Sequence, residues 1–176
     1  MSELIHIWWE GPYSLDEVRE MKNAARDYGV YQVYGTHALY GSGVLLYIGK
    51  AQEQTFAVRI SQETWTENRD ARNVQIYVGR LYRSSHEERP DLGGWSRQIN
   101  DAEKLLIYAH GPVFNTCNKN TVPESVVDLH VFNWGQYRML LPEVSGFRYV
   151  RWRNCTDESP CYEMTLSEMK ENRPVT

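Results

Sequence analysis

The chain has 176 residues, which suits one domain, because domains commonly span about 100–200 residues and two would be cramped. Hydrophobic residues make up 41% and charged residues 24%, the balance of a globular protein, and no apolar run reaches the ~18 residues that would cross a bilayer. The formal net charge of −4 excludes a surface coated with positive charge for indiscriminate nucleic-acid binding, since phosphate affinity comes mainly from Lys and Arg.

The first 28 residues are predicted to cover the core. Residues 5–9 indicate a short strand, and the spacing Ser14-x-x-Glu17 is that of a capping box, which predicts a helix through Arg26.

Residues 29–120 carry the main pattern of elements. Strands are predicted over 29–35, 44–51 and 73–81, and the first two are joined by a hairpin loop over 36–43. Helical spacing covers 53–65 and 95–109, and the second helix is expected to end at Gly111-Pro112. The order β-β-α-β-α predicts an α+β fold with a small central antiparallel three-stranded sheet flanked by helices.

Residues 121–176 are predicted to form a C-terminal β extension with an acidic tail. Segments 128–134, 137–141 and 147–152 indicate two or three short strands, and 167–171 has a weak helical signal. The three cysteines, Cys117, Cys155 and Cys161, include no Cys-x-x-Cys pair, so neither a disulfide framework nor a zinc knuckle is indicated. The N-terminus lacks a basic segment followed by an apolar one, and we expect a cytoplasmic protein.

Glu103 is the most informative single residue. On a helical wheel it falls between Ile99 and Ile107, inside the apolar stripe of the second helix. A carboxylate there must be paired, protonated or bound to a cation. The sequence leaves two explanations of Glu103 open, a buried salt bridge to Lys50 or Arg59 and a metal site.

Arg59 lies on the apolar face of the first helix, with Phe56 and Ile60, and Glu63 follows it by four residues. An Arg and a Glu at this spacing often pair with each other. The alternative is that the planar guanidinium of Arg59 holds a phosphate.

Other polar residues have ordinary structural explanations when each is taken alone. Tyr31, Tyr34 and Tyr47 fit a strand core, and Asn115 fits a turn. A phenol with a pKa near ~10 relays protons at neutral pH only beside a cationic group.

Short motifs and single residues, in order, resemble the GIY-YIG nuclease superfamily over residues 29–115. Gly29-Val30-Tyr31 resembles the family's Gly-Ile-Tyr, and Tyr47-Ile48-Gly49-Lys50 its Tyr-Ile-Gly followed by Lys. Arg59 stands where the family carries its helical Arg, Glu103 where it carries its metal-binding Glu, and Pro112-Val113-Phe114-Asn115 matches its Pro-x-x-Asn.

The resemblance implies a metal-dependent endonuclease that hydrolyses phosphodiester bonds of DNA, with RNA left open as a substrate. Glu103 would hold Mg²⁺ or Mn²⁺, Tyr31 or Tyr47 would activate a water, and Arg59 with Lys50 would balance the charge of the transition state. Asn115 would orient neighbouring groups. No membrane partner is expected, and a homodimer would suit cutting of both strands.

One residue departs from the family pattern. Four residues after the Arg the family usually has His or Tyr, whereas this chain has Glu63. Glu63 would either compete with phosphate for Arg59 or act as a general base or assist the metal. The alternative function is therefore a catalytically weak or inactive module that binds nucleic acid without cutting it.

Overall fold

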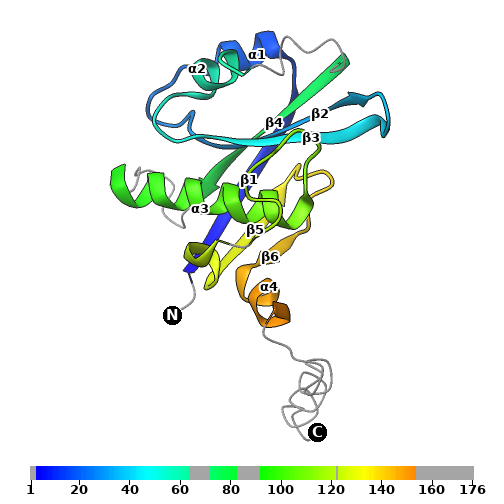
Figure 1. Cartoon of the computed structure of the whole chain (residues 1–176). Coiled ribbons are helices and arrows are strands. Elements are labelled where there is room, and N and C mark those ends of the chain that lie inside the picture. The colour runs from blue at the N-terminus through cyan, green and yellow to red at the C-terminus, as the bar shows by residue number, and fades with distance from the viewer. Residues whose placement is uncertain (1–2, 64–71, 83–91, 122, 154–176) are drawn as a thin grey trace, which may run out of the picture.

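The computed structural model describes residues 3–63, 72–82, 92–121 and 123–153. Their centre is one curled sheet of six strands in the order β3-β2-β4-β1-β5-β6 (Figure 1). The strands are β1 (Glu3–Tyr13), β2 (Gly29–His37), β3 (Gly41–Ala51), β4 (Arg72–Tyr82), β5 (Leu129–Gly135) and β6 (Glu143–Ser145). Neighbours are antiparallel except β1 and β5, which run parallel, so the sheet is mixed.

The predicted small three-stranded sheet flanked by helices is wrong. The three predicted strands do pair, in the order β3-β2-β4, but β4 does not form an edge of the sheet. The backbone groups on its outer side hydrogen-bond to β1, and β1 in turn pairs with β5. An unpaired strand edge leaves hydrogen-bonding groups without partners, and the N-terminal and C-terminal segments supply those partners here. The division into 1–28, 29–120 and 121–176 stays a prediction.

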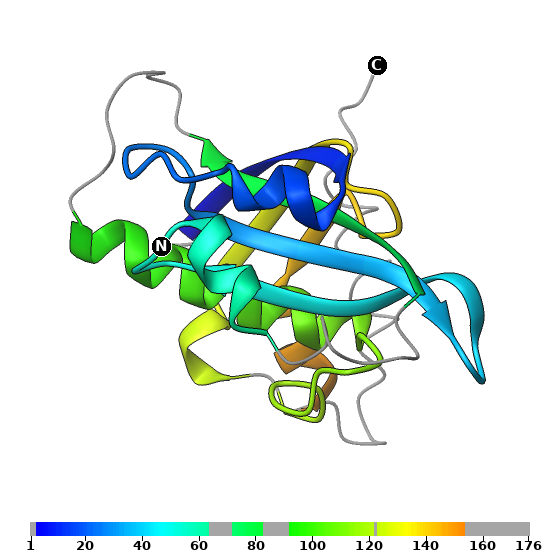
Figure 2. The same ribbon diagram turned by 90° about the horizontal axis from the view of Figure 1, so that it is seen from above.

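The helices are few, and the principal ones lie on both faces of the sheet. The short helices α1 (Leu15–Arg19) and α2 (Phe56–Ser61) cover β2, β3 and β4 on one face (Figures 1 and 2). The long helix α3 (Leu92–His110) packs on the other face. A 3-10 turn, η2 (Glu124–Val126), and the helix α4 (Gly146–Arg153) add side chains to the apolar cluster on that face. Among the described residues, no helix is long and apolar enough to cross a membrane.

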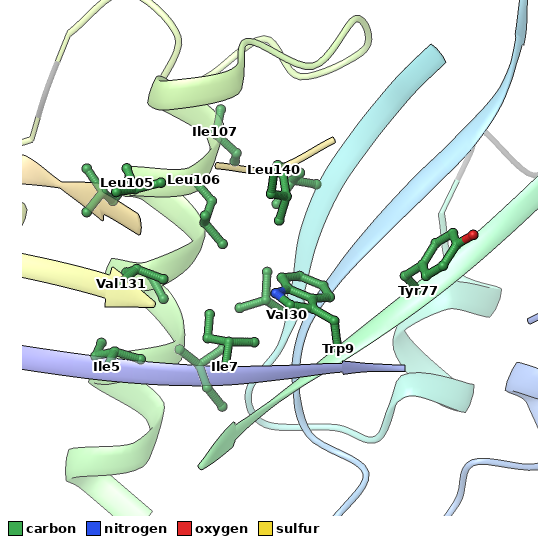
Figure 3. Close-up of a cluster of buried hydrophobic side chains, with 14 of the residues drawn as sticks. Ile5, Ile7, Trp9, Val30, Tyr77, Leu105, Leu106, Ile107, Val131 and Leu140 are labelled. Atoms are coloured by element: carbon green, nitrogen blue, oxygen red, sulfur yellow. The ribbon is translucent and has the colours of Figure 1, made fainter. Parts of the chain in front are cut away.

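Two apolar clusters, one on each face, hold the fold together. The larger one joins alternate residues of the central strands to α3, and Figure 3 shows Ile7, Trp9 and Val30 pointing toward Leu106. The smaller one places Val18 of α1 and Phe56 and Ile60 of α2 against the opposite side of β2 and β4. Because side chains alternate between the two faces of a strand, β2, β3 and β4 each contribute residues to both clusters.

Several predicted elements have different bounds. The capping box at Ser14 is present, but α1 ends at Arg19 instead of Arg26. The side chain of Asn23 accepts a hydrogen bond from the backbone nitrogen of Ala25, and the carboxylate of Asp27 accepts one from that of Asn23. Such local side-chain bonds compete with helical ones. Helix α2 spans six residues within the predicted 53–65, of which 64 and 65 lie outside the described residues.

The C-terminal strand predictions are only partly confirmed. Strand β5 matches the segment 128–134, whereas 137–141 is a turn in which Arg138 has a φ of 57°, and 147–152 lies in the helix α4. Strand β6 was not predicted as a separate element. The weak helix at 167–171 and most of the loop at 83–94 lie outside the described residues.

Candidate active site

The two tyrosine motifs meet because β2 and β3 are hydrogen-bonded neighbours. Tyr31 on β2 lies directly opposite Gly49 on β3, and the rings of Tyr31 and Tyr47 are 6.1 Å apart at their centroids. A Cβ at Gly49 would overlap the hydroxyl of Tyr31 and come within 2.7 Å of Cε1 of Tyr47. The glycine therefore makes the space in which the two phenols sit. Likewise, Gly29 has a φ of 147°, and a Cβ there would overlap the carbonyl oxygen of Gly79.

Helix α2 and the segment that follows it bring a guanidinium and a carboxylate to the tyrosines. The hydroxyl of Tyr31 donates to Oε1 of Glu63 at 2.8 Å, and Nη2 of Arg59 lies 2.5 Å from the same oxygen. The side chain of Glu63 is 11% exposed and that of Arg59 34%. The expected pairing of Arg59 with Glu63 is thus present, while the remaining guanidinium donors reach toward solvent and toward Tyr47.

Tyr47 is the more accessible of the two tyrosines. It is half-buried, whereas Tyr31 is fully buried. Burial and the negative charges of Glu63 and Glu103 raise the pKa of Tyr47 to about 12, although Arg59 acts in the opposite direction. Burial, reinforced by Glu63, raises the pKa of Tyr31 well above its usual value. Both phenols are therefore neutral at physiological pH.

Glu103 reaches the same cluster from the opposite face of the sheet. Its Oε2 lies 2.7 Å from Nζ of Lys50, which also donates to Oδ1 of Asn100 at 2.6 Å. Burial raises the pKa of Glu103, while Lys50, Arg59 and Lys104 oppose that rise. Glu103 is thus buried, as its place on the helical wheel predicted, and of the two cations considered for a salt bridge it is Lys50 that pairs with it.

Asn115 fixes the strand that carries Tyr47 and Gly49. Its Oδ1 accepts from the backbone nitrogen of Ile48 and its Nδ2 donates to the carbonyl oxygen of the same residue, both at 2.9 Å. The amide thus replaces a strand neighbour at the outer edge of β3. The nearby backbone nitrogen of Phe114 donates to the carbonyl of Leu46 at 2.8 Å. Asn115 acts on the cluster through the backbone of β3.

The structure therefore brings six predicted residues into one cluster at the outer edge of the sheet. The seventh bonds to the backbone of β3 and does not join the cluster directly. The six are Tyr31, Tyr47, Lys50, Arg59, Glu63 and Glu103, and the seventh is Asn115. Sequence reasoning missed Asn100 as a partner of Lys50, although its position three residues before Glu103 puts both on one side of α3. It also missed the space that Gly49 provides.

The oxygen donors of the cluster decide whether it suits a divalent cation. Glu103 offers one buried carboxylate, and in the described part of the chain no three His, Cys, Asp or Glu residues gather as a metal cage. Mg²⁺ commonly takes only one or two carboxylates and completes its shell with water and substrate phosphate. The donor set thus fits a cation shared between Glu103 and a bound phosphate.

Comparisons with protein-family models, with curated proteins and with solved structures found no match.

Proposed function

We propose that the chain is a metal-dependent endonuclease that hydrolyses phosphodiester bonds of DNA at this cluster. The observation that supports the proposal most is the convergence of two tyrosines, two cations and two carboxylates at the edge strand β3. These groups come from two strands, two helices and the segment after α2, and each has a use in phosphoryl transfer. The cations can hold a phosphate, and the carboxylates can bind a metal ion and accept a proton.

In this mechanism the phosphate binds against the exposed side of Arg59 and Lys50. A divalent cation bound at Glu103 would neutralise charge on the phosphate and stabilise the leaving oxygen. The hydroxyl of Tyr47, the more exposed phenol, orients the attacking water. Glu63 takes up the proton that the water releases, since its carboxylate already lies within the tyrosine cluster. Tyr31 and Arg59 hold that carboxylate in place.

The second candidate function is nucleic-acid binding without cleavage. The observation that favours it is that both cations of the cluster already have carboxylate partners, at 2.7 Å for Lys50 and 2.5 Å for Arg59. A phosphate must compete with these pairs. If Lys50 and Arg59 keep their ion pairs, their remaining donors can still attract a phosphate. The paired carboxylates of Glu103 and Glu63 would then not be available to bind a metal ion or to accept a proton.

The two functions are separated by a cleavage assay with supercoiled plasmid, single-stranded DNA and RNA, in Mg²⁺, in Mn²⁺ and in a chelator. We expect nicking that requires the metal and falls on the order of a hundredfold or more in Glu103→Gln, as for other losses of electrostatic stabilisation. The matched control is Glu53→Gln, which changes an exposed glutamate. Circular dichroism of each variant checks the fold.

Cleavage in the chelator, or equal cleavage by Glu103→Gln and the unaltered chain, would contradict the proposed metal site. Binding of DNA at low salt without any cleavage would support the second function. Cleavage of RNA alone would change the substrate but keep the chemistry.

A further inference from the structure

Aromatic side chains continue outward from the candidate active site along β3. Phe114 packs against the same smaller apolar cluster as Tyr47, and its backbone nitrogen donates to the carbonyl of Leu46 at 2.8 Å. The ring centroid of His37 lies 5.6 Å from that of Phe114, and the ring of Tyr40 stacks on that of His37 at 4.9 Å. We call Tyr47, Phe114, His37 and Tyr40 the aromatic row.

The outer end of the aromatic row is accessible and held in one arrangement. Tyr40 is 67% exposed, whereas His37 and Phe114 are half-buried. The backbone nitrogen of Leu39 donates to Nδ1 of His37 at 3.2 Å, which fixes the imidazole that stacks on Tyr40. Figure 2 shows the β2–β3 hairpin projecting beyond the rest of the sheet. Rings ordered before binding lose little entropy when a planar group stacks on them.

The segments that carry the outer three rings differ in charge from the whole chain. Residues 36–46 and 112–121 contain no Asp or Glu, although the chain has a net charge of −4. Lys119, in the second segment, donates to the carbonyl oxygen of Pro112 at 2.7 Å, and a bond to a carbonyl does not neutralise its charge. These segments therefore carry no charge that repels a phosphate backbone.

Aromatic rings with few cations suit a single strand of nucleic acid better than a duplex. In a duplex the bases stack on one another, so binding depends on cations that contact phosphates, and Lys50 and Arg59 already pair with carboxylates. In a single strand the base faces are open to stack on aromatic side chains. Roughly 30 Å of β3 separates Gly41 from Lys50, a length that accommodates several nucleotides.

We propose that the aromatic row binds single-stranded DNA, whose bases stack on Tyr40 and His37 while its backbone follows β3 toward Lys50 and Arg59. The inference deepens the proposed nuclease function by naming the substrate as a single strand, and it rests on that function for the cutting of the strand at the cluster. Sequence preference is expected to be weak, because every base has a face that can stack.

Fluorescence anisotropy of a labelled single strand of about 12 nucleotides, at low salt and in a chelator, tests the proposal on the full chain. We expect the strand to bind about fivefold or more tightly than its duplex, and Tyr40→Leu to weaken binding by about fivefold or more, the scale of one stacked base. Tyr40→Trp keeps a ring and should retain the affinity. The matched control Trp8→Leu removes a 49% exposed ring from β1 and should change nothing. Thermal unfolding monitors the fold, and Tyr40→Gln replaces Tyr40→Leu if that variant fails to fold.

Absence of binding at low salt overturns the proposal, and so do equal affinities for strand and duplex or for Tyr40→Leu and the unaltered chain. Equal losses in Tyr40→Leu and Tyr40→Trp would also overturn it, because stacking requires only a ring. A loss confined to Trp8→Leu would overturn it in favour of the exposed face of β1. Because binding is measured without metal, the expected pattern with no cleavage in Mg²⁺ would contradict only the nuclease function.

Discussion

At the scale of single residues, the two tyrosines of the cluster differ in what surrounds their hydroxyl groups. Tyr31 is fully buried and its hydroxyl is committed to Glu63. Tyr47 is half-buried and closer to where a substrate can approach. The sequence motifs contain both tyrosines in equivalent contexts, so the difference follows from the packing of α2 on β2. In the proposed mechanism Tyr31 is a positioning residue and Tyr47 the catalytic one.

Removing the two hydroxyls should therefore have different effects. We expect Tyr47→Phe to lower kcat on the order of a hundredfold, the scale of a lost orientation of the attacking water, and to change stability by less than about 1 kcal/mol. Tyr31→Phe should cost about 1–2 kcal/mol of unfolding free energy, because it takes a donor from the largely buried Glu63, and should lower kcat less. Single-turnover cleavage and urea denaturation measure both quantities. The reverse ranking in kcat would assign the substrate-facing role to Tyr31.

At the scale of elements, α3 carries out two tasks with different parts of its length. Its middle presents Asn100 and Glu103 to Lys50 on the edge strand β3. Its last residue, His110, connects the helix to the turn after β5. Nδ1 of His110 bonds to the carbonyl oxygen of Leu106 at 2.9 Å, and Nε2 accepts from the backbone nitrogen of Leu141 at 2.8 Å. This pattern requires a neutral ring with its proton on Nδ1.

His110 should make stability depend on pH. Burial lowers the pKa of His110 in the folded state below its usual value of 6.5, although the bond to Leu106 acts in the opposite direction. The unfolded chain thus takes up a proton first as the pH falls, so the contribution of His110 is complete above about pH 6.5 and declines below it. We expect urea denaturation to show less loss between pH 7.5 and 5.5 in His110→Gln than in the unaltered chain. Equal losses would show that His110 does not titrate in this way.

At the scale of the whole molecule, β1 joins segments that are far apart in sequence. It lies between β4 and β5, antiparallel to one and parallel to the other. Its side chains alternate between the larger apolar cluster and the opposite face of the sheet, where Leu4 and Trp8 are exposed. Trp9 is 1% exposed and donates from Nε1 to Oδ1 of Asn133 at 2.8 Å, whereas its neighbour Trp8 is 49% exposed. Residues 3–13 are therefore part of the central sheet.

Adjacent tryptophans offer a test of this position. Trp9→Ala should destabilise the fold by about 3–5 kcal/mol, because it empties a packed site and leaves Asn133 without its donor. Trp8→Ala, one residue away, should cost less than about 1 kcal/mol, because its side chain is 49% exposed. Chemical denaturation of both variants gives the comparison. Similar losses would mean that β1 does not lie at the centre of the sheet.

The sequence by itself determined the features that depend on neighbouring residues. The alternation in 73–81 predicted β4, the helical period placed Glu103 on a buried face, and the spacing of Arg59 and Glu63 allowed the ion pair that forms. Only the tertiary structure decided which strands pair with the outer side of β4, that 147–152 is helical, and that Lys50 is the partner of Glu103. Hydrogen-bond partners of a sheet edge and the neighbours of a buried charge come from distant segments, so local patterns do not specify them.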